Sequence, residues 1–255
     1  MNVIKVMGGL GNQLFQYAFG KAQMLNGIDV AFDTSFYNNK MKWPRPYRLD
    51  KFIPVKQSPF LNQPIIKGHK RGFDKGLLKL SNHNFDGYWQ YKEYYEDILN
   101  ELRMDLFIDP DFHTAEFRSL YYYIDTCDSI SIHVRRGDYL VQTWGILPFS
   151  YYLNALTQIS GKKIFIFSDD IPWCKLHFKK EYFSKEIMFV DVEDYLAFEL
   201  MKTCKHNIIG SSTFSWWAAV LNSNPNKTVV APSQWLGETK KNPFDYIYPL
   251  NWKVC

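Results

Sequence analysis

The chain has 255 residues, of which 46% are hydrophobic and 22% charged, so it is not disordered and can bury the core of one large or two small domains. A formal charge of +4 without a long block of lysine and arginine argues against nucleic-acid binding. Aromatic residues make up 18% of the chain. Packing explains most of them, but Tyr and Trp also suit the flat faces of sugar rings.

The first elements of the chain predict a β-α-β unit. Residues 3–6 form a short apolar strand that ends at the glycine turn 8–11. Apolar residues then recur at helical spacing over 12–25, and a second strand is expected over 28–32. A strand, a helix and a strand in this order favour a parallel sheet.

The second half of the chain alternates regularly between strands and helices. It follows a proline-rich middle, 35–115, in which no sheet can be traced and only a helical segment near 91–102 is expected. Strands are predicted over 129–134, 163–167, 187–190, 207–209 and 228–231, and helices over 151–159, 195–202 and 214–221. This alternation predicts a doubly wound α/β domain. We place the boundary near residue 120, giving an N-terminal domain of residues 1–120 and a C-terminal domain of residues 121–255.

The glycine turn 8–11 is the first of several polar strand ends, where open parallel sheets bind their ligands. Glycines let the backbone approach a ligand, and the following helix offers free N–H groups to an anion. Leu14 replaces the third glycine of a dinucleotide fingerprint, and the Gly-Lys-Ser/Thr end of a Walker loop is missing. A tight turn and a binding loop both fit; the amides of Asn12 and Gln13 favour contacts with sugar hydroxyls or phosphate.

A second strand end carries His-x-Arg-Arg-Gly-Asp at 133–138. The adjacent guanidinium groups of Arg135 and Arg136 repel each other unless anions bind them. A diphosphate would supply those anions, and arginine suits bidentate phosphate contacts. The alternative is an arginine pair bonded to Asp138 and other carboxylates.

Two further strand ends carry hydroxyl and carboxylate groups. Residues 211–213 and 215 place four hydroxyls at the start of a helix, where a phosphate would take up the spare donors, although ordinary capping by Ser212 or Thr213 is the alternative. Asp169 and Asp170 follow another strand. Their spacing does not match the Asp-x-Asp metal grip of some glycosyltransferases, so helix capping or a contact with guanine is favoured.

Together these segments resemble the bacterial α-1,2-fucosyltransferases of glycosyltransferase family 11. The resemblance rests on GGLGNQLFQYAFGKA at 8–22, DGYWQYKEYYED at 86–97, IHVRRGDY at 132–139, FSDD at 167–170 and GSSTFSWWAAVLN at 210–222. The arginine motif and the serine- and tryptophan-rich motif are highly specific in combination. The proline-rich middle region departs most from the family pattern, which leaves the acceptor open.

The resemblance implies an α/β fold of the GT-B type, with two facing Rossmann-like, doubly wound domains. It implies that the first domain, residues 1–120, is the acceptor side and that the second, residues 121–255, holds a GDP-fucose site that requires no metal and no other cofactor. Arg135 would hold the β-phosphate, His133 would lie beside the nucleotide, and Asn12 would lie at the cleft between donor and acceptor. The other residues expected to contact the donor are Gly9, Gly11, Arg136, Asp169, Asp170, Ser212, Thr213, Phe214 and Ser215.

The resulting hypothesis is an inverting galactoside 2-α-L-fucosyltransferase acting on an oligosaccharide or lipid-linked glycan. Arg135 would neutralise the departing diphosphate. Asp138, His133 and the more remote Asp33 are candidates for the base, unless the acceptor hydroxyl loses its proton late without one. The alternatives are a metal-dependent transferase that uses the adjacent aspartates, a transferase with another nucleotide sugar or linkage, and a non-enzymatic carbohydrate-binding module.

The sequence also predicts where the protein acts. No apolar run approaches the roughly 18 residues of a membrane span, and the amino terminus lacks the features of a signal peptide. Four scattered cysteines without a C-x-x-C pair disfavour zinc and fit a reduced compartment. We expect a cytoplasmic protein without a transmembrane segment. The basic run 67–71 is expected to be a solvated loop and would also suit peripheral contact with the inner face of the membrane.

Overall fold

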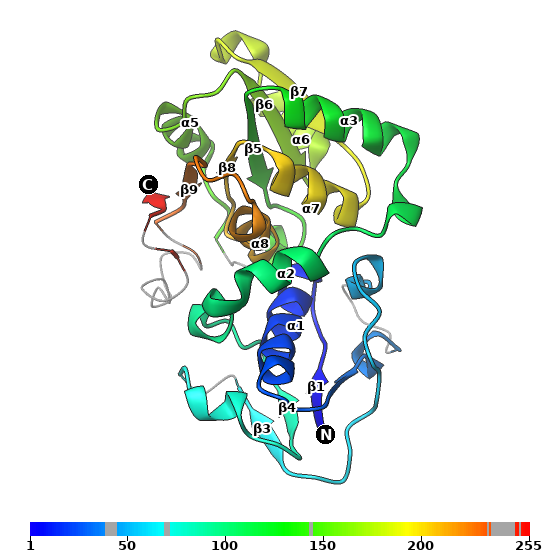
Figure 1. The fold of residues 1–255 in the computed structure, drawn as a ribbon. Coiled ribbons are helices and arrows are strands. Elements are labelled where there is room, and N and C mark those ends of the chain that lie inside the picture. The colour runs from blue at the N-terminus through cyan, green and yellow to red at the C-terminus, as the bar shows by residue number, and fades with distance from the viewer. Residues whose placement is uncertain (39–44, 69–71, 143–144, 234, 236–247, 250) are drawn as a thin grey trace. The chain divides into compact units, whose positions relative to one another are not determined.

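The computed structural model describes residues 1–255 except 39–44, 69–71, 143–144, 234, 236–247 and 250, so part of the basic run 67–71 lies outside the described residues. The chain forms two compact units, Met1–Asp109 and Pro110–Cys255 (Figure 1). This division lies earlier than the expected boundary near residue 120, which falls inside helix α3 (Ala115–Thr126). The Thr114 side chain caps α3 by accepting a hydrogen bond from the Phe117 N–H, so the whole helix belongs to the second unit.

The first unit contains a four-stranded parallel sheet in the order β2-β1-β4-β3. The predicted β-α-β unit is confirmed as β1 (Asn2–Lys5), α1 (Leu10–Leu25) and β2 (Val30–Asp33). β3 (Ile65–Lys67) and β4 (Asn84–Asp86) come from the middle region, where no sheet was predicted. Strands of three residues are too short to show a period of two.

Aromatic side chains fill much of the core of this unit. Phe19 of α1 stacks on Trp89 with ring centroids 4.4 Å apart, and Tyr94 meets Phe19 edge-on at 5.0 Å. Packing therefore accounts for a large part of the aromatic content. The helical segment expected near 91–102 consists of short 3-10 turns followed by α2 (Leu99–Asp105). The 3-10 turns of the unit are Ser35–Asn38 (η1), Leu49–Lys51 (η2), Lys75–Leu78 (η3), Lys92–Tyr94 (η4) and Glu96–Ile98 (η5).

The second unit contains a six-stranded parallel sheet. Its strands are β5 (Ser129–Val134), β6 (Lys163–Ser168), β7 (Glu186–Val190), β8 (His206–Ile208), β9 (Val229–Ala231) and β10 (Lys253–Val254). Besides α3, its helices are α4 (Tyr139–Gln142), α5 (Phe149–Thr157), α6 (Ile171–His177), α7 (Asp194–Thr203) and α8 (Thr213–Leu221), with 3-10 turns at Pro110–Phe112 (η6) and Lys180–Tyr182 (η7).

The strands and helices predicted for this half are confirmed to within about two residues, whereas α3, α4, α6 and β10 were not predicted. The capping interpretation of Asp169 and Asp170 implied a helix after them, but its residues were not predicted; Pro172 lies in its first turn. Proline fits the first turn of a helix, where its missing N–H would have no partner in any case.

The order β10-β9-β8-β5-β6-β7 makes this sheet doubly wound. From β5 the chain continues outward through β6 to β7, then returns to β8 on the other side of β5. Ile130 and Ile132 of β5 pack in a core with Tyr152 of α5 on one face of the sheet. Because side chains alternate along a strand, His133 points to the other face, where its ring lies 5.4 Å from that of Phe214 in α8. The direction of winding thus reverses between β5 and β8.

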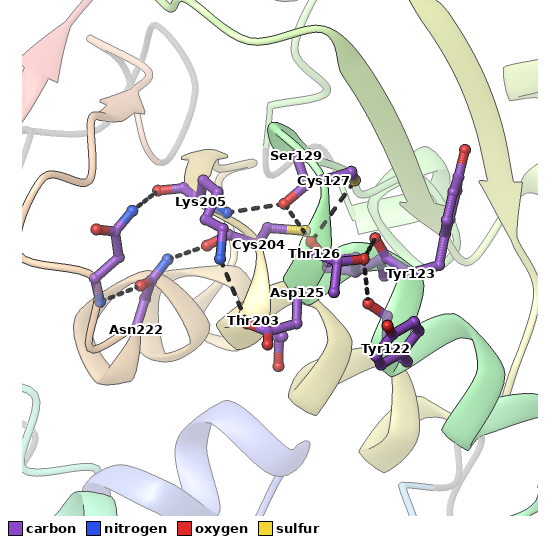
Figure 2. A network of polar contacts seen from close by, with 12 residues as sticks. Tyr122, Tyr123, Asp125, Thr126, Cys127, Ser129, Thr203, Cys204, Lys205 and Asn222 are labelled. Carbon is purple, nitrogen blue, oxygen red and sulfur yellow. Dashed lines mark hydrogen bonds and ion pairs between the residues drawn. The ribbon is translucent and has the colours of Figure 1, made fainter.

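Polar contacts fix the two central strands at their amino ends (Figure 2). The hydroxyl of Ser129, at the start of β5, accepts a hydrogen bond of 3.0 Å from the Lys205 N–H, just before β8. Asn222, which caps the end of α8, donates to the Cys204 carbonyl at 2.7 Å. It also donates to Asn207 Oδ1 at 2.8 Å. These buried contacts hold β5, β8 and α8 in a fixed register.

Candidate functional site

Three predicted polar segments meet at one edge of the second sheet. β5 lies between β8 and β6, with Ile132 paired to Ile208 and Val134 paired to Ser168. Since all three strands are parallel, the segments that follow them, 133–138, 168–170 and 209–215, emerge side by side. The reversal between β5 and β8 places two of these segments at the topological switch point, where doubly wound sheets bind ligands.

Arg135 leaves the end of β5 and is held by two carboxylates. Its guanidinium donates to Asp138 and forms an ion pair of 2.6 Å with Asp169, which follows β6. Its guanidinium carbon also lies 5.3 Å from the centroid of the Tyr139 ring. The side chain of Arg135 is 17% exposed, so this charge is fixed and partly accessible. The structure thus shows the alternative given above, an arginine pair bonded to Asp138 and other carboxylates.

Arg136 faces helix α6. Its Nε forms an ion pair of 3.0 Å with Asp170, and its guanidinium lies 4.1 Å from the centre of the Trp173 ring. Trp173 in turn stacks on His177 at 3.9 Å. Asp170 also caps α6 by accepting a hydrogen bond of 3.1 Å from the Trp173 N–H, as the capping interpretation expected. Arg136 thus anchors α6 while Arg135 lies toward the switch point.

Asp169 bonds both adjacent arginines, Arg135 and Arg136. Its Oδ1 accepts a hydrogen bond of 2.9 Å from the backbone N–H of Arg136, while its Oδ2 pairs with Arg135. A Cβ at Gly137 would collide with this carboxylate, which explains why glycine follows the arginines. Counted with Asp138 and Asp170, three carboxylates surround two guanidinium groups. An anionic ligand that contacts Arg135 therefore meets a guanidinium that already bonds Asp138 and Asp169.

His133 is buried under the residues that follow β8. A side chain at Gly210 would meet its backbone carbonyl and approach its Nδ1, so the close approach of the two segments requires glycine there. Burial first, and the charge of Arg135 second, lower the pKa of His133 to about 3. The imidazole is therefore neutral near pH 7. Its Nδ1 is buried and has no hydrogen-bond partner among the residues that the structure describes.

Helix α8 begins at the switch point with its hydroxyl residues partly engaged. Ser212 caps the helix through its hydroxyl, which accepts from the Phe214 N–H at 3.4 Å. Ser215 is buried and donates back to the Ser212 carbonyl at 3.3 Å. The Ser211 carbonyl accepts from the Tyr139 hydroxyl at 2.8 Å, which ties the turn after β5 to the turn after β8. The two turns are thus held together beside the first N–H groups of the helix.

The glycine turn lies at the carboxyl edge of the first unit's sheet. Gly8 has φ +82°, a conformation that glycine adopts without strain. Gly9 precedes α1 and accepts from the backbone N–H groups of Asn12 and Gln13, while Gly11 is buried in the first turn. The Asn12 side chain accepts from Gln90 at 3.0 Å.

Gln13 holds the glycine turn in place, contrary to the interpretation that its amide binds a sugar or a phosphate. Its side chain is fully buried and donates to the Gly8 and Pro46 carbonyls at 3.1 and 2.9 Å. Its oxygen accepts from the Arg48 N–H at 2.9 Å. These contacts come from a proline-rich loop whose path the sequence does not reveal.

Sequence reasoning did not single out Tyr139 and Trp173. Tyr139 directly follows the arginine motif, so an aromatic residue at that position was the available signal. Trp173 could have been found from Pro172, had the proline been recognised as the first turn of α6.

Within the described ranges, no group of three or more His, Cys, Asp or Glu residues could hold a metal ion. No helix in the same part of the chain is long and apolar enough to cross a membrane.

Comparison with solved structures establishes the fold. The chain superimposes on the NodZ α-1,6-fucosyltransferase co-crystallised with GDP with a TM-score of 0.55, at 14% identity over 85% of this chain and 91% of that one. For POFUT1 in complex with GDP the TM-score is 0.52, at 11% identity over 90% and 97% of the chains. The expected α/β fold of the GT-B type is therefore confirmed.

Comparison of sequences establishes the family. An alpha-1,2-colitosyltransferase of Escherichia coli is 28% identical over 95% of both chains. The O-antigen biosynthesis glycosyltransferase WbnK of Escherichia coli is 35% identical, over 46% of this chain and 42% of WbnK. The galactoside alpha-(1,2)-fucosyltransferase 1 of Leontocebus fuscicollis is 29% identical, over 36% and 28%. The profile of glycosyl transferase family 11 matches residues 1–254, and the chain belongs to that family.

Proposed function

We propose that the protein is an inverting fucosyltransferase that moves L-fucose from GDP-β-L-fucose to the 2-OH of a terminal galactoside, giving an α-1,2 linkage. The observation that carries the proposal is Arg135, a fixed cation at the switch point beside the start of α8. Family membership and the GDP bound to NodZ and POFUT1 support a guanosine diphosphate donor. The name of WbnK supports an acceptor that belongs to a surface polysaccharide or its lipid-linked precursor.

In the proposed reaction, the acceptor hydroxyl attacks C1 of fucose from the face opposite the diphosphate. The bond between C1 and the β-phosphate oxygen breaks, and GDP leaves with its electron pair. The guanidinium of Arg135 and the free N–H groups at the start of α8 stabilise the charge that develops on GDP. We assign this task to protein groups and to no divalent cation, so turnover should persist in excess EDTA.

The proton of the acceptor hydroxyl leaves late in this scheme. A pKa of about 3 makes His133 a poor proton acceptor near pH 7. Asp138 is buried and bound by Arg135, which favours its role as the structural partner of that arginine. With an oxocarbenium-like transition state, the oxygen becomes acidic once the new C–O bond forms, and the proton passes to water or to an exposed carboxylate.

The similarity to a colitosyltransferase favours GDP-colitose as a second candidate donor. Colitose is fucose without its 3-hydroxyl, so a pocket can accept both sugars unless it bonds that hydroxyl. A site built to bond a hydroxyl rejects the analogue without it by a factor of about 10⁴–10⁵. The ratio of the two donor rates therefore reports whether the pocket bonds the 3-hydroxyl.

A donor panel tests the proposal. The protein is incubated with GDP-fucose, GDP-colitose, GDP-mannose or UDP-galactose and with lactose as acceptor, and nucleotide release is followed. The linkage of the isolated product is determined by NMR. We expect the fastest turnover with GDP-fucose and an α-1,2 product. Faster turnover with GDP-colitose would show that colitose, and not fucose, is the sugar transferred. A product with another linkage would show that a hydroxyl other than the 2-OH is the acceptor, and inactivity with every GDP-sugar would refute the proposal.

A further inference from the structure

A polar hollow lies at the carboxyl end of β2 in the first unit. Its volume is about 270 Å³, enough for one monosaccharide ring. It is lined by Phe32, Asp33, Thr34, Ser35, Asn38, Gln57, Ser58 and Pro59. The lining combines hydroxyls, amides and one carboxylate with an aromatic ring and a proline, which is the mixture of groups that suits an uncharged sugar.

Asp33 is the most informative residue of the hollow. Its side chain is only 7% exposed, yet it forms no ion pair within the described part of the chain. One oxygen, Oδ1, accepts a hydrogen bond of 2.9 Å from the Ser35 N–H. Buried carboxylates are usually paired, because removing a charge from water is costly. The carboxylate thus retains capacity to accept hydrogen bonds from hydroxyl groups of a ligand.

The part of the lining that Gln57 and Ser58 form is held in place by backbone hydrogen bonds to β2. Gln57 forms an isolated parallel bridge with Phe32, flanked by hydrogen bonds from the Phe32 N–H to Lys56 at 2.8 Å and from the Ser58 N–H to Phe32 at 3.1 Å. The Thr34 hydroxyl donates to Gln57 Oε1 at 2.9 Å, which orients the amide. A preformed wall of this kind loses little entropy when a ligand binds.

The hollow shares its sheet edge with the glycine turn. The Val6 N–H donates to the Asp33 carbonyl at 2.9 Å, and the 3-10 turn η1 begins directly beyond β2. From η1, the Tyr37 hydroxyl donates to the Gly8 carbonyl at 3.0 Å. The hollow and the turn that holds Asn12 are therefore neighbouring parts of one structure at the carboxyl edge of this sheet.

We propose that this hollow binds a sugar ring of the acceptor, with the Asp33 carboxylate accepting hydrogen bonds from its hydroxyls and the Gln57 amide donating one. This inference rests on the proposed transferase function. It goes beyond that function by naming residues of the first unit as the subsite for one uncharged sugar ring of the acceptor.

Asp33→Asn and Gln57→Ala test the inference, with Asp29→Asn as the matched control. Asp29 directly precedes β2, at the end opposite Asp33, and among the described residues its carboxylate pairs with exposed Lys56, at 2.8 Å, so its change removes the same charge outside the hollow. For each protein we would measure the KM for lactose, the release of GDP from GDP-fucose without acceptor, and the thermal shift caused by GDP. Binding of methyl β-galactoside is followed separately by saturation-transfer NMR.

We expect Asp33→Asn to raise the KM for lactose at least tenfold and to abolish saturation transfer, since a hydrogen bond to a charged group is lost. GDP release without acceptor should change less than twofold in Asp29→Asn, and the GDP-induced thermal shift should be retained in all three variants. Gln57→Ala, at an exposed position, should raise the KM severalfold even if Asp33→Asn does not fold. Equal KM values for Gln57→Ala and Asp29→Asn would overturn the inference. Absence of any GDP-induced shift in the wild type would instead refute the proposed function.

Discussion

Replacement of Arg135 by lysine is the most direct test of how the site handles charge. The guanidinium reaches two carboxylates at once, Asp138 and Asp169, because its fork presents donors in two directions. Lysine carries the same charge at one point and cannot reproduce both contacts, nor a bidentate contact with a diphosphate. One charge-assisted hydrogen bond contributes about 1.5–3 kcal/mol. GDP should therefore bind roughly 10- to 150-fold more weakly.

The effect on turnover should be larger than the effect on binding. Charge develops on the diphosphate as the C1–O bond breaks, so it is greater in the transition state than in the bound donor, and loss of one preorganised donor typically costs roughly 10²–10³ in kcat. GDP affinity is measured by calorimetry and turnover by GDP release with saturating lactose. Arg136→Lys is the matched control: its contacts with Asp170 and Trp173 predict a lower melting temperature and a smaller loss of turnover. Near-wild-type turnover in Arg135→Lys, or equal losses in the two variants, would refute this reasoning.

Three further outcomes are expected. Asp138→Asn should reduce turnover by about tenfold, because the amide still accepts one hydrogen bond from Arg135; a loss near 10⁴-fold in GDP release would assign Asp138 as the base. Because the pKa of His133 is lowered from 6.5 to about 3, the folded state resists its protonation, so stability present above pH 6.5 is lost as the pH falls toward 3. A His133→Asn variant should show a flatter dependence of the melting temperature on pH between 6 and 4, and parallel curves would contradict this. Asn222→Leu should lower the melting temperature, by roughly 2–4 °C for each kcal/mol of stability that is lost, because the buried Cys204 carbonyl and Asn207 Oδ1 lose their donor. An unchanged melting temperature in calorimetry would show that these contacts do not stabilise the fold.

The sequence predicted which segments come together better than it predicted the contacts among them. Parallel strands end at one edge of a sheet, so segments 133–138 and 211–215 were expected to meet, and they do. The partner of Arg135 depends on strand order, because Asp169 reaches it only when β6 lies next to β5. No spacing along the chain encodes that order.

The first unit shows where local patterns give too little information. β3 and β4 each have three residues, and their pairing is decided by tertiary contacts. Gln13 was expected to face a ligand, but its amide instead donates to the Pro46 carbonyl and accepts from the Arg48 N–H. Amide side chains near a glycine turn can serve either purpose, and only the path of the distant loop distinguishes them.

The pairing of Arg135 with two carboxylates has a consequence for which anions the site admits. Inorganic phosphate and sulfate bind readily to an open guanidinium. Asp138 and Asp169 already fill that position, so a small anion gains little by displacing them. A nucleotide sugar brings a base, a ribose and two phosphates, and contacts with all of them can compensate for the exchange. Asp138 and Asp169 would thus disfavour small inorganic anions relative to a nucleoside diphosphate.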